Sequence, residues 1–216
     1  MMHNISSAQT DADNFYRSDA VTAEKVSFPN QYKMKVGANL FRPKEMKPGE
    51  KRPAIIVGHP MGAVKEQAAN LYAIKMAERG FVTLAIDLSF WGDSEGEPRN
   101  TVSPEIYAED FSAAVDFLTT LPEVDAERIG IIGICGFGGF AINAAAADTR
   151  IKATVASTMY DISRCTANGY FDAMDADARY ELRRQLSAQR TEDAARGTYV
   201  RAGGVVDPLP ADEMHN

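Results

Sequence analysis

Short apolar runs alternate with amphipathic stretches from about residue 25 to residue 160. Residues 54–58 are wholly apolar, which is typical of strands buried on both faces of a parallel sheet, and residues 81–88, 128–134 and 151–158 predict three further buried strands. Between these runs, residues 66–79, 103–121 and 138–147 carry apolar side chains at helical spacing or are rich in alanine. Strand and helix therefore alternate, which predicts parallel βαβ units with right-handed crossovers. The stretches KVSF and YKMKVGANLF, which precede this alternation, predict a leading hairpin.

The pattern divides the chain into three parts. We expect a flexible N-terminal tail over residues 1–20, an α/β core over residues 21–160, and a helical, lid-like segment with a tail over residues 161–216. Residues 172–196 are dense in charge and alanine. Only a narrow apolar stripe, made by Ala178, Leu182 and Leu186, runs along them. This is typical of a surface helix.

Composition excludes several classes of partner. The 216 residues are 45% hydrophobic and 25% charged, with a net charge of −7, and an acidic surface does not favour nucleic acid or anionic membranes. No apolar run approaches the roughly 20 residues that span a bilayer. The start of the chain has neither a basic flank nor an apolar core, and there are only two cysteines, Cys135 and Cys165. We therefore expect a cytoplasmic protein with free thiols. No cluster has metal-ligand spacing, so we expect no metal and no cofactor.

Three polar, glycine-containing loops follow predicted strands: GHPMGA, DLSFWGDSEG and CGFGG. In open parallel sheets, ligands bind outside the carboxyl ends of the strands, which is where these loops lie. The third loop delivers Cys135 to a predicted helix start, where orphan N–H groups favour a thiolate over a thiol. Neighbouring glycines allow the sharp turn that exposes such a side chain. The alternative interpretation is that Cys135 is a small buried apolar residue and that the glycines serve only helix packing.

These loops resemble those of the α/β-hydrolase superfamily, in its dienelactone-hydrolase-like branch, over residues 25–161. RIGIIGIC resembles the strand that leads to the nucleophile elbow, where cysteine can replace serine, and this implies that Cys135 is the nucleophile. GHPMG resembles the loop that contributes an oxyanion-hole N–H, which implies Met61 as one donor and Gly136 as the other. DLSFWGDSEGEPR resembles the Asp-x-x-x-x-Gly-x-Ser-x-Gly loop that borders the substrate cleft.

The sequence departs from the pattern of this branch in two ways. First, Phe137 stands where the elbow has its last small residue, so we expect its ring to line the substrate site or to distort the turn. Second, the family takes its histidine from a loop far downstream of the elbow, and this chain has only His3, His59 and His215. We expect the last strands of the family to be missing. His59 is a secondary candidate for the base and Asp161 for the acid, although both residue types serve structure more often.

Residues of the second loop have two interpretations. Trp91 can line the substrate pocket or cover the core, and the sequence does not separate the two. Asp87 ends a predicted strand, and we expect its side chain to fix the following turn. Asp93, Glu95 and Glu97 are expected to form a solvated acidic face, because only Arg99 is placed to pair with them.

The sequence is compatible with three different functions. The first is a hydrolase that attacks a small-molecule ester, thioester or lactone through Cys135. The second is a non-catalytic or truncated α/β-hydrolase relative that acts by binding. The third is a dinucleotide-binding oxidoreductase, because GFGGFA at 136–141 matches the G-x-G-x-x-A fingerprint with Asp161 as the acidic partner. If the sheet ends at residues 151–158, that strand is an open edge, and a homodimer through it is expected.

Overall fold

The computed structural model describes residues 13–200. The chain divides into two compact units, Met1–Tyr160 and Asp161–Asn216.

A six-stranded sheet forms the centre of the first unit. Its strand order is β1-β2-β4-β3-β5-β6, in which β1 and β2 form an antiparallel hairpin and β4, β3, β5 and β6 run parallel. β2 pairs antiparallel with β4, so the hairpin extends the sheet on one side. The predicted hairpin and the open, mostly parallel sheet are thereby confirmed. The strands are β1 (Val21–Pro29), β2 (Lys35–Pro43), β3 (Arg52–Gly58), β4 (Val82–Ile86), β5 (Val124–Ile134) and β6 (Ile151–Ser157).

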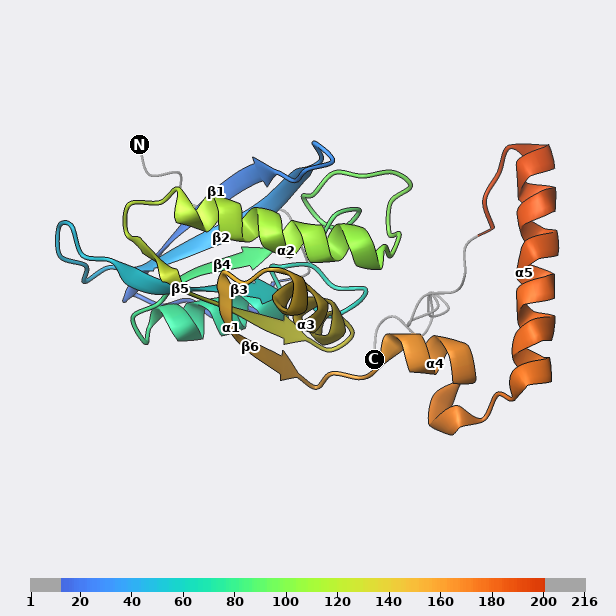
Figure 1. Ribbon diagram of the computed structural model, residues 1–216. Helices are drawn as coiled ribbons and strands as arrows, with labels where there is room; N and C mark the ends of the chain where they lie inside the picture. The colour runs from blue at the N-terminus through green and yellow to red at the C-terminus, as the bar shows by residue number, and fades with distance from the viewer. Residues whose placement is uncertain (1–12, 201–216) are drawn as a thin grey trace. The chain divides into compact units, whose positions relative to one another are not determined.

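Helices cover both faces of this sheet, as predicted. They are α1 (Ala68–Ala77), α2 (Pro104–Thr119) and α3 (Phe137–Ala147). α1 packs on β2, β3 and β4, whereas α2 and α3 pack on each other and on β5 from the opposite face (Figure 1). The central strands read as continuous apolar runs because both of their faces are covered: Ile56 and Val57 of β3 and Leu84 of β4 are all fully buried.

The strand order creates a switch point between β3 and β5. These two strands are neighbours, but the helices that follow them, α1 and α3, lie on opposite faces of the sheet. Gly58 of β3 is in register with Ile86 of β4 and with Gly133 of β5, so the three strands end at the same level. The loops after them therefore meet at one edge of the sheet, which is where ligands bind in open α/β folds.

The first residues that the structure describes are bound to α1 and its N-terminal turn. The Asn14 side chain donates hydrogen bonds to the carbonyl oxygens of Glu66 (2.9 Å) and Gln67 (3.1 Å), and the Tyr16 hydroxyl donates one to Glu78 (2.5 Å). Asn14 and Tyr16, which lie in the predicted tail, are therefore bound to this part of the chain, and the flexibility of residues 13–20 stays a prediction. Residues 1–12 of the predicted tail lie outside the described residues.

β6 is an edge strand, as predicted, and its residues 152–155 are exposed. The homodimer expected from this edge stays a prediction. Beyond it, the second unit contains α4 (Ile162–Asn168), a short 3-10 turn η1 (Tyr170–Asp172) and α5 (Ala176–Arg196). None of these three elements buries a side chain. α5 confirms the predicted surface helix and ends at Gly197, which adopts the left-handed conformation (φ 66°) common in helix C-caps.

Across residues 13–200, no helix combines the length and the apolar character that crossing a membrane requires.

Candidate active site

Cys135 stands at the tip of a sharp turn between β5 and α3. Its φ angle is +58°, a left-handed conformation that is uncommon and strained for a residue with a side chain. Its N–H donates to the Ser157 carbonyl (2.8 Å) at the end of β6, and its carbonyl accepts from the Gly138 N–H (3.0 Å). The thiol is unpaired and half-buried. This is the backbone geometry of a nucleophile elbow, which presents a side chain above the carboxyl end of a strand.

Gly133 is required two residues before this turn because α3 passes directly over it. A Cβ atom at this position would lie 2.7 Å from the Cα of Gly138 and 2.7 Å from the Cβ of Ala141. Both of these atoms belong to the first turns of α3, and neither is the flexible end of a side chain. The glycine therefore sets how closely α3 approaches β5, and with it the position of Cys135 between them.

Phe137 does not line a cleft, so this prediction was wrong. Its ring is fully buried and packs against His59 (ring centroids 4.7 Å apart), Tyr107 (5.2 Å) and Phe140 (5.6 Å). The first two contacts are edge-to-face, an arrangement that aromatic rings favour. The turn accommodates a large residue here because α3 directs the side chain inward, between the sheet and α2. No distortion of the turn is needed.

The predicted oxyanion loop follows β3 and forms a tight turn. The Ala63 N–H donates to the Pro60 carbonyl (3.1 Å), and Gly62, at the third position, has a φ of +78°, as a type II turn requires. Met61 occupies the second position of this turn. Within residues 13–200, neither the Met61 N–H nor the Gly136 N–H donates a hydrogen bond to the protein. Their role as oxyanion donors stays a prediction.

His59 is held as a structural residue, which argues against its candidacy as the base. Its ring is fully buried. Nδ1 lies 2.8 Å from the Pro60 carbonyl, to which it donates, and Nε2 accepts the Leu88 N–H at 3.3 Å. Burial is the main cause that lowers the pKa of His59, so the ring is neutral at physiological pH. With both nitrogens engaged, no lone pair is free to take a proton.

Asp161, the candidate acid, caps a helix. Its carboxylate accepts the Arg164 N–H (2.9 Å) at the start of α4 and a hydrogen bond from the Ser163 hydroxyl. The Ser163 hydroxyl first, and the Arg164 amide second, hold the pKa of this exposed carboxyl below its ordinary value. The capping interpretation, which the sequence left open, describes this residue. His3 and His215 lie outside the described residues.

Trp91 covers the core and stays half-exposed. Its indole N–H donates to the Tyr107 hydroxyl (2.7 Å) and to the Thr101 carbonyl (3.1 Å). The indole lies near the His59 ring, with centroids 6.5 Å apart. The aromatic cluster of Trp91, His59, Tyr107 and Phe137 therefore ties the loop after β4 to the elbow and to the oxyanion loop.

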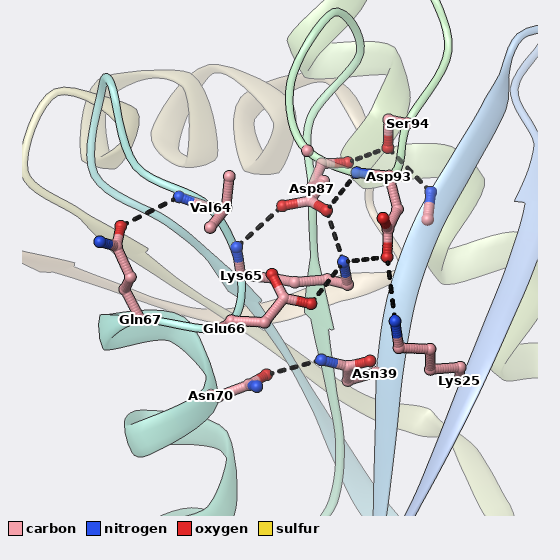
Figure 2. Close-up of polar contacts among 12 residues, drawn as sticks. Lys25, Asn39, Val64, Lys65, Glu66, Gln67, Asn70, Asp87, Asp93 and Ser94 are labelled. Atoms are coloured by element: carbon pink, nitrogen blue, oxygen red, sulfur yellow. Dashed lines mark hydrogen bonds and ion pairs between the residues drawn. The ribbon is translucent and has the colours of Figure 1, made fainter. Parts of the chain in front are cut away.

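A buried ionic network that the sequence reading missed lies beside these loops (Figure 2). The Lys65 ammonium contacts Asp87 (2.6 Å), Asp93 (2.7 Å) and Glu66 (2.8 Å). Burial alone would lower the pKa of Lys65, but the charge of Asp87 and the hydrogen bonds to the carboxylates outweigh it, and the pKa lies above its ordinary value. One signal could have revealed this residue: a carboxylate at the end of a wholly apolar strand needs a buried partner of opposite charge.

Asp87 fixes the turn after β4, as predicted. Its carboxylate accepts the Asp93 N–H (2.9 Å), and Gly92 is required because a Cβ there would lie 2.2 Å from an Asp87 oxygen. Asp93, Glu95 and Glu97 are exposed, as expected of a solvated acidic face. The expectation that only Arg99 is placed to pair with them was wrong, because Asp93 pairs with Lys65 and, at 3.5 Å, with Lys25. Glu95 also accepts the Lys35 N–H (2.9 Å) at the surface.

A second buried carboxylate, Asp110 of α2, was also missed. It accepts the Ser89 N–H (2.7 Å), the Ser89 hydroxyl (2.9 Å) and the Asn30 amide (2.8 Å). Burial raises the pKa of Asp110 to about 6, although these donors oppose the shift. The residue joins α2, the loop after β4 and the β1–β2 turn, so its position is structural.

The same region of the chain resembles known proteins. The model of the dienelactone hydrolase family matches residues 36–160. The uncharacterized protein PA2218 of Pseudomonas aeruginosa is 54% identical over 184 residues, which are 85% of this chain and 49% of that protein. Its crystal structure superposes with a TM-score of 0.85 at 50% identity, covering 93% of this chain and 63% of the solved one.

Two further relatives are less similar. The uncharacterized protein YcjY of Escherichia coli is 41% identical over 177 residues, which are 81% of this chain and 58% of that protein. The thiohydrolase aneE of Aspergillus aculeatus is 39% identical over 100 residues, which are 46% of this chain and 31% of that protein.

The chain belongs to the dienelactone hydrolase family. It spans about half the length of the curated relatives it matches. Membership favours the hydrolase interpretation over the dinucleotide-binding one, whose acidic partner, Asp161, is engaged as a helix cap.

Proposed function

We propose that this chain carries the nucleophile half of a hydrolase that acts on a carboxylic ester, thioester or lactone of a small molecule. The observation that carries the proposal is the left-handed backbone of Cys135 at the strand-to-helix turn, at the edge where the loops after β3, β4 and β5 meet. Such strain persists where the surrounding structure supports it, and it clusters at active sites. A thiohydrolase among the relatives adds support for a thioester substrate.

The proposed reaction proceeds in two steps. The Cys135 thiolate adds to the acyl carbon, and the carbonyl π electrons move to the oxygen, where the N–H groups of Met61 and Gly136 stabilise the charge. The carbonyl re-forms as the bond between the acyl carbon and the leaving group breaks. The leaving group keeps the bonding electron pair and, where it is basic enough, takes a proton from water, which leaves a thioester on Cys135. Water then adds to this thioester and releases the acid and the free thiol. The second step needs a general base, which contributes about 10²–10⁴ in rate.

Within residues 13–200 the only histidine, His59, has both ring nitrogens engaged. We therefore propose that this chain alone acylates readily and deacylates slowly. We further propose that it works in the cytoplasm and needs neither a metal nor a cofactor.

A rapid-mixing assay with 4-nitrophenyl butyrate tests the proposal on the full chain. We expect a burst of about one equivalent of nitrophenolate per chain, followed by slow turnover. The burst should vanish in Cys135→Ala and persist in Cys165→Ala, the matched control on the other cysteine. A burst of full amplitude in Cys135→Ala would overturn the assignment. Fast steady turnover that is lost in His59→Gln, while the burst remains, would make His59 the base.

The second candidate function is binding without turnover. The engaged nitrogens of His59 favour it, because they leave the described chain without an imidazole base. In that case the chain binds a non-hydrolysable acyl amide but shows no burst with the ester.

A further inference from the structure

Lys65 is a buried cation with an unusual excess of carboxylates around it. The side chain is 1% exposed, and its ammonium contacts one fully buried carboxylate, Asp87, and two more accessible ones, Asp93 and Glu66 (Figure 2). Burying such a group is expensive, and a well-packed apolar pair often gives equal stability. A network of this kind is best explained where it fixes a geometry that apolar packing would leave loose.

The geometry that this network fixes is that of the loop after β3. Asp87 binds Lys65 through both carboxylate oxygens. One oxygen accepts a hydrogen bond from the Lys65 main-chain N–H (2.8 Å), and the other accepts one from its ammonium group (2.6 Å). At the other end of the same loop, His59 accepts the N–H of Leu88 (3.3 Å), the residue that follows Asp87. Both ends of the loop are therefore fastened to two consecutive residues at the end of β4.

Between these two attachments lies the turn of residues 60–63, which carries the unpaired Met61 N–H. Among the described residues, no hydrogen bond or ion pair joins residues 60–63 to Lys65, Asp87 or Asp93, so we infer that the position of the turn depends on the two residues that anchor it, His59 and Lys65. Asp87 is in turn held by Asp93, whose N–H it accepts (2.9 Å) and whose side chain also contacts Lys25 of β1 (3.5 Å). The anchorage thus extends from the loop into the hairpin at the edge of the sheet.

We propose that Lys65 is a positioning residue that, through Asp87, holds the Met61 N–H at the place where the acyl oxygen becomes negative. This rests on the proposed function, because it assigns Lys65 a part in the acylation of Cys135. A hydrogen-bond donor of an oxyanion hole is worth about 10²–10³ in rate, and it acts only when its position is fixed beforehand. Loss of the anchor should therefore slow acylation with little effect on substrate binding.

The test compares Lys65→Met with Lys75→Met, a matched control in which an exposed α1 lysine loses its contacts with Tyr16 and Glu78 instead. We expect Lys65→Met to lower the rate constant of the nitrophenolate burst by about 10–100-fold. The half-saturating ester concentration should change less than about threefold. Lys75→Met should acylate at the wild-type rate, and Lys65→Arg should recover most of the activity.

A second readout separates positioning from general damage. Alkylation of Cys135 by iodoacetamide forms no oxyanion, so its rate should be the same in Lys65→Met and in wild type. Since Lys65→Met leaves Asp87 buried without a counter-ion, the double variant Lys65→Met/Asp87→Asn removes both fully buried charges and should fold, and it should acylate as slowly as the single variant.

Each outcome separates the two proposals. A folded single or double variant that acylates at the wild-type rate overturns the role of Lys65 and leaves the nucleophile assignment intact. Equal slowing of acylation and alkylation also overturns it, because Lys65 would then serve the fold only. A wild-type chain without any burst contradicts the proposed function, and the role of Lys65 falls with it.

Discussion

The Phe137 ring fills the space between His59, Tyr107 and Phe140, where it has no contact with solvent. Removing a buried aromatic ring costs about 3–5 kcal/mol. We therefore expect Phe137→Ala to lower the free energy of unfolding by that amount, measured by denaturant titration with Trp91 fluorescence. Phe15→Ala removes a ring that is 79% exposed and should change stability by less than about 0.5 kcal/mol. Equal effects of the two substitutions would contradict the core assignment.

Asp110 should make stability depend on pH. Its pKa is about 6 in the folded chain and ordinarily 3.8, so the folded state binds the proton more tightly than the unfolded state does. The stability that protonated Asp110 contributes is therefore full below about pH 4 and lost as the pH rises through about 6. At about 1.4 kcal/mol per pKa unit, the change is up to about 3 kcal/mol.

Since other carboxyl groups titrate in the same range, the quantity to measure is the stability of wild type minus that of Asp110→Asn at pH 4, 5, 6 and 7. We expect this difference to become less favourable to wild type by up to about 3 kcal/mol as the pH rises. A difference that stays constant across the range, or that changes in the opposite direction, would contradict the raised pKa.

At the scale of single elements, α3 packs closely against β5 because Gly133 has no side chain. A methyl group at Gly133 would meet backbone atoms of α3 at 2.7–2.9 Å, whereas one at Gly139 would meet no atom within 4 Å. We expect Gly133→Ala to destabilise the fold by about 1–3 kcal/mol through overpacking. Gly139→Ala should stabilise α3 by about 0.5–1 kcal/mol, because alanine loses less conformational freedom in a helix. Thermal unfolding of the two variants checks the predicted difference in sign.

The same elements show what the sequence could predict. The runs 54–58, 81–88 and 128–134 became largely buried strands, and the breaks at Gly80 and Pro122 fall between elements as expected. Residues 151–158 also became a strand, β6, but its expected burial was wrong, because it lies at the edge of the sheet with residues 152–155 exposed. The position of Cys135 followed from its place between a strand and a glycine-rich helix. The direction of the Phe137 side chain did not, because motif spacing specifies which residues form a turn but not which face of the helix each one occupies. Lys65 was missed because its carboxylate partner, Asp87, lies 22 residues away in the sequence.

On the scale of the whole chain, the two units differ in how they are stabilised. The first has a continuous core, whereas α4 and α5 bury no side chain. Segments without buried contacts open readily and are cleaved first. We expect brief treatment with trypsin to cut α5 at its arginines within the time that leaves residues 13–160 intact, as judged by mass. Equal resistance of the two units would show that another surface covers α5.

The nucleophilic role of Cys135 is tested most directly by where an acyl group is deposited on the chain. Because trypsin cuts after Arg128, Arg150, Arg164 and Arg179, the two cysteines fall in separate peptides, 129–150 and 165–179. The decisive measurement is therefore peptide mass mapping of the chain, quenched in acid immediately after the nitrophenolate burst. We predict one butyryl group per chain, on the peptide that contains Cys135 and absent from that peptide in Cys135→Ala. A butyryl group on the Cys165 peptide, or a burst that leaves no acyl group on residues 129–150, would contradict the account.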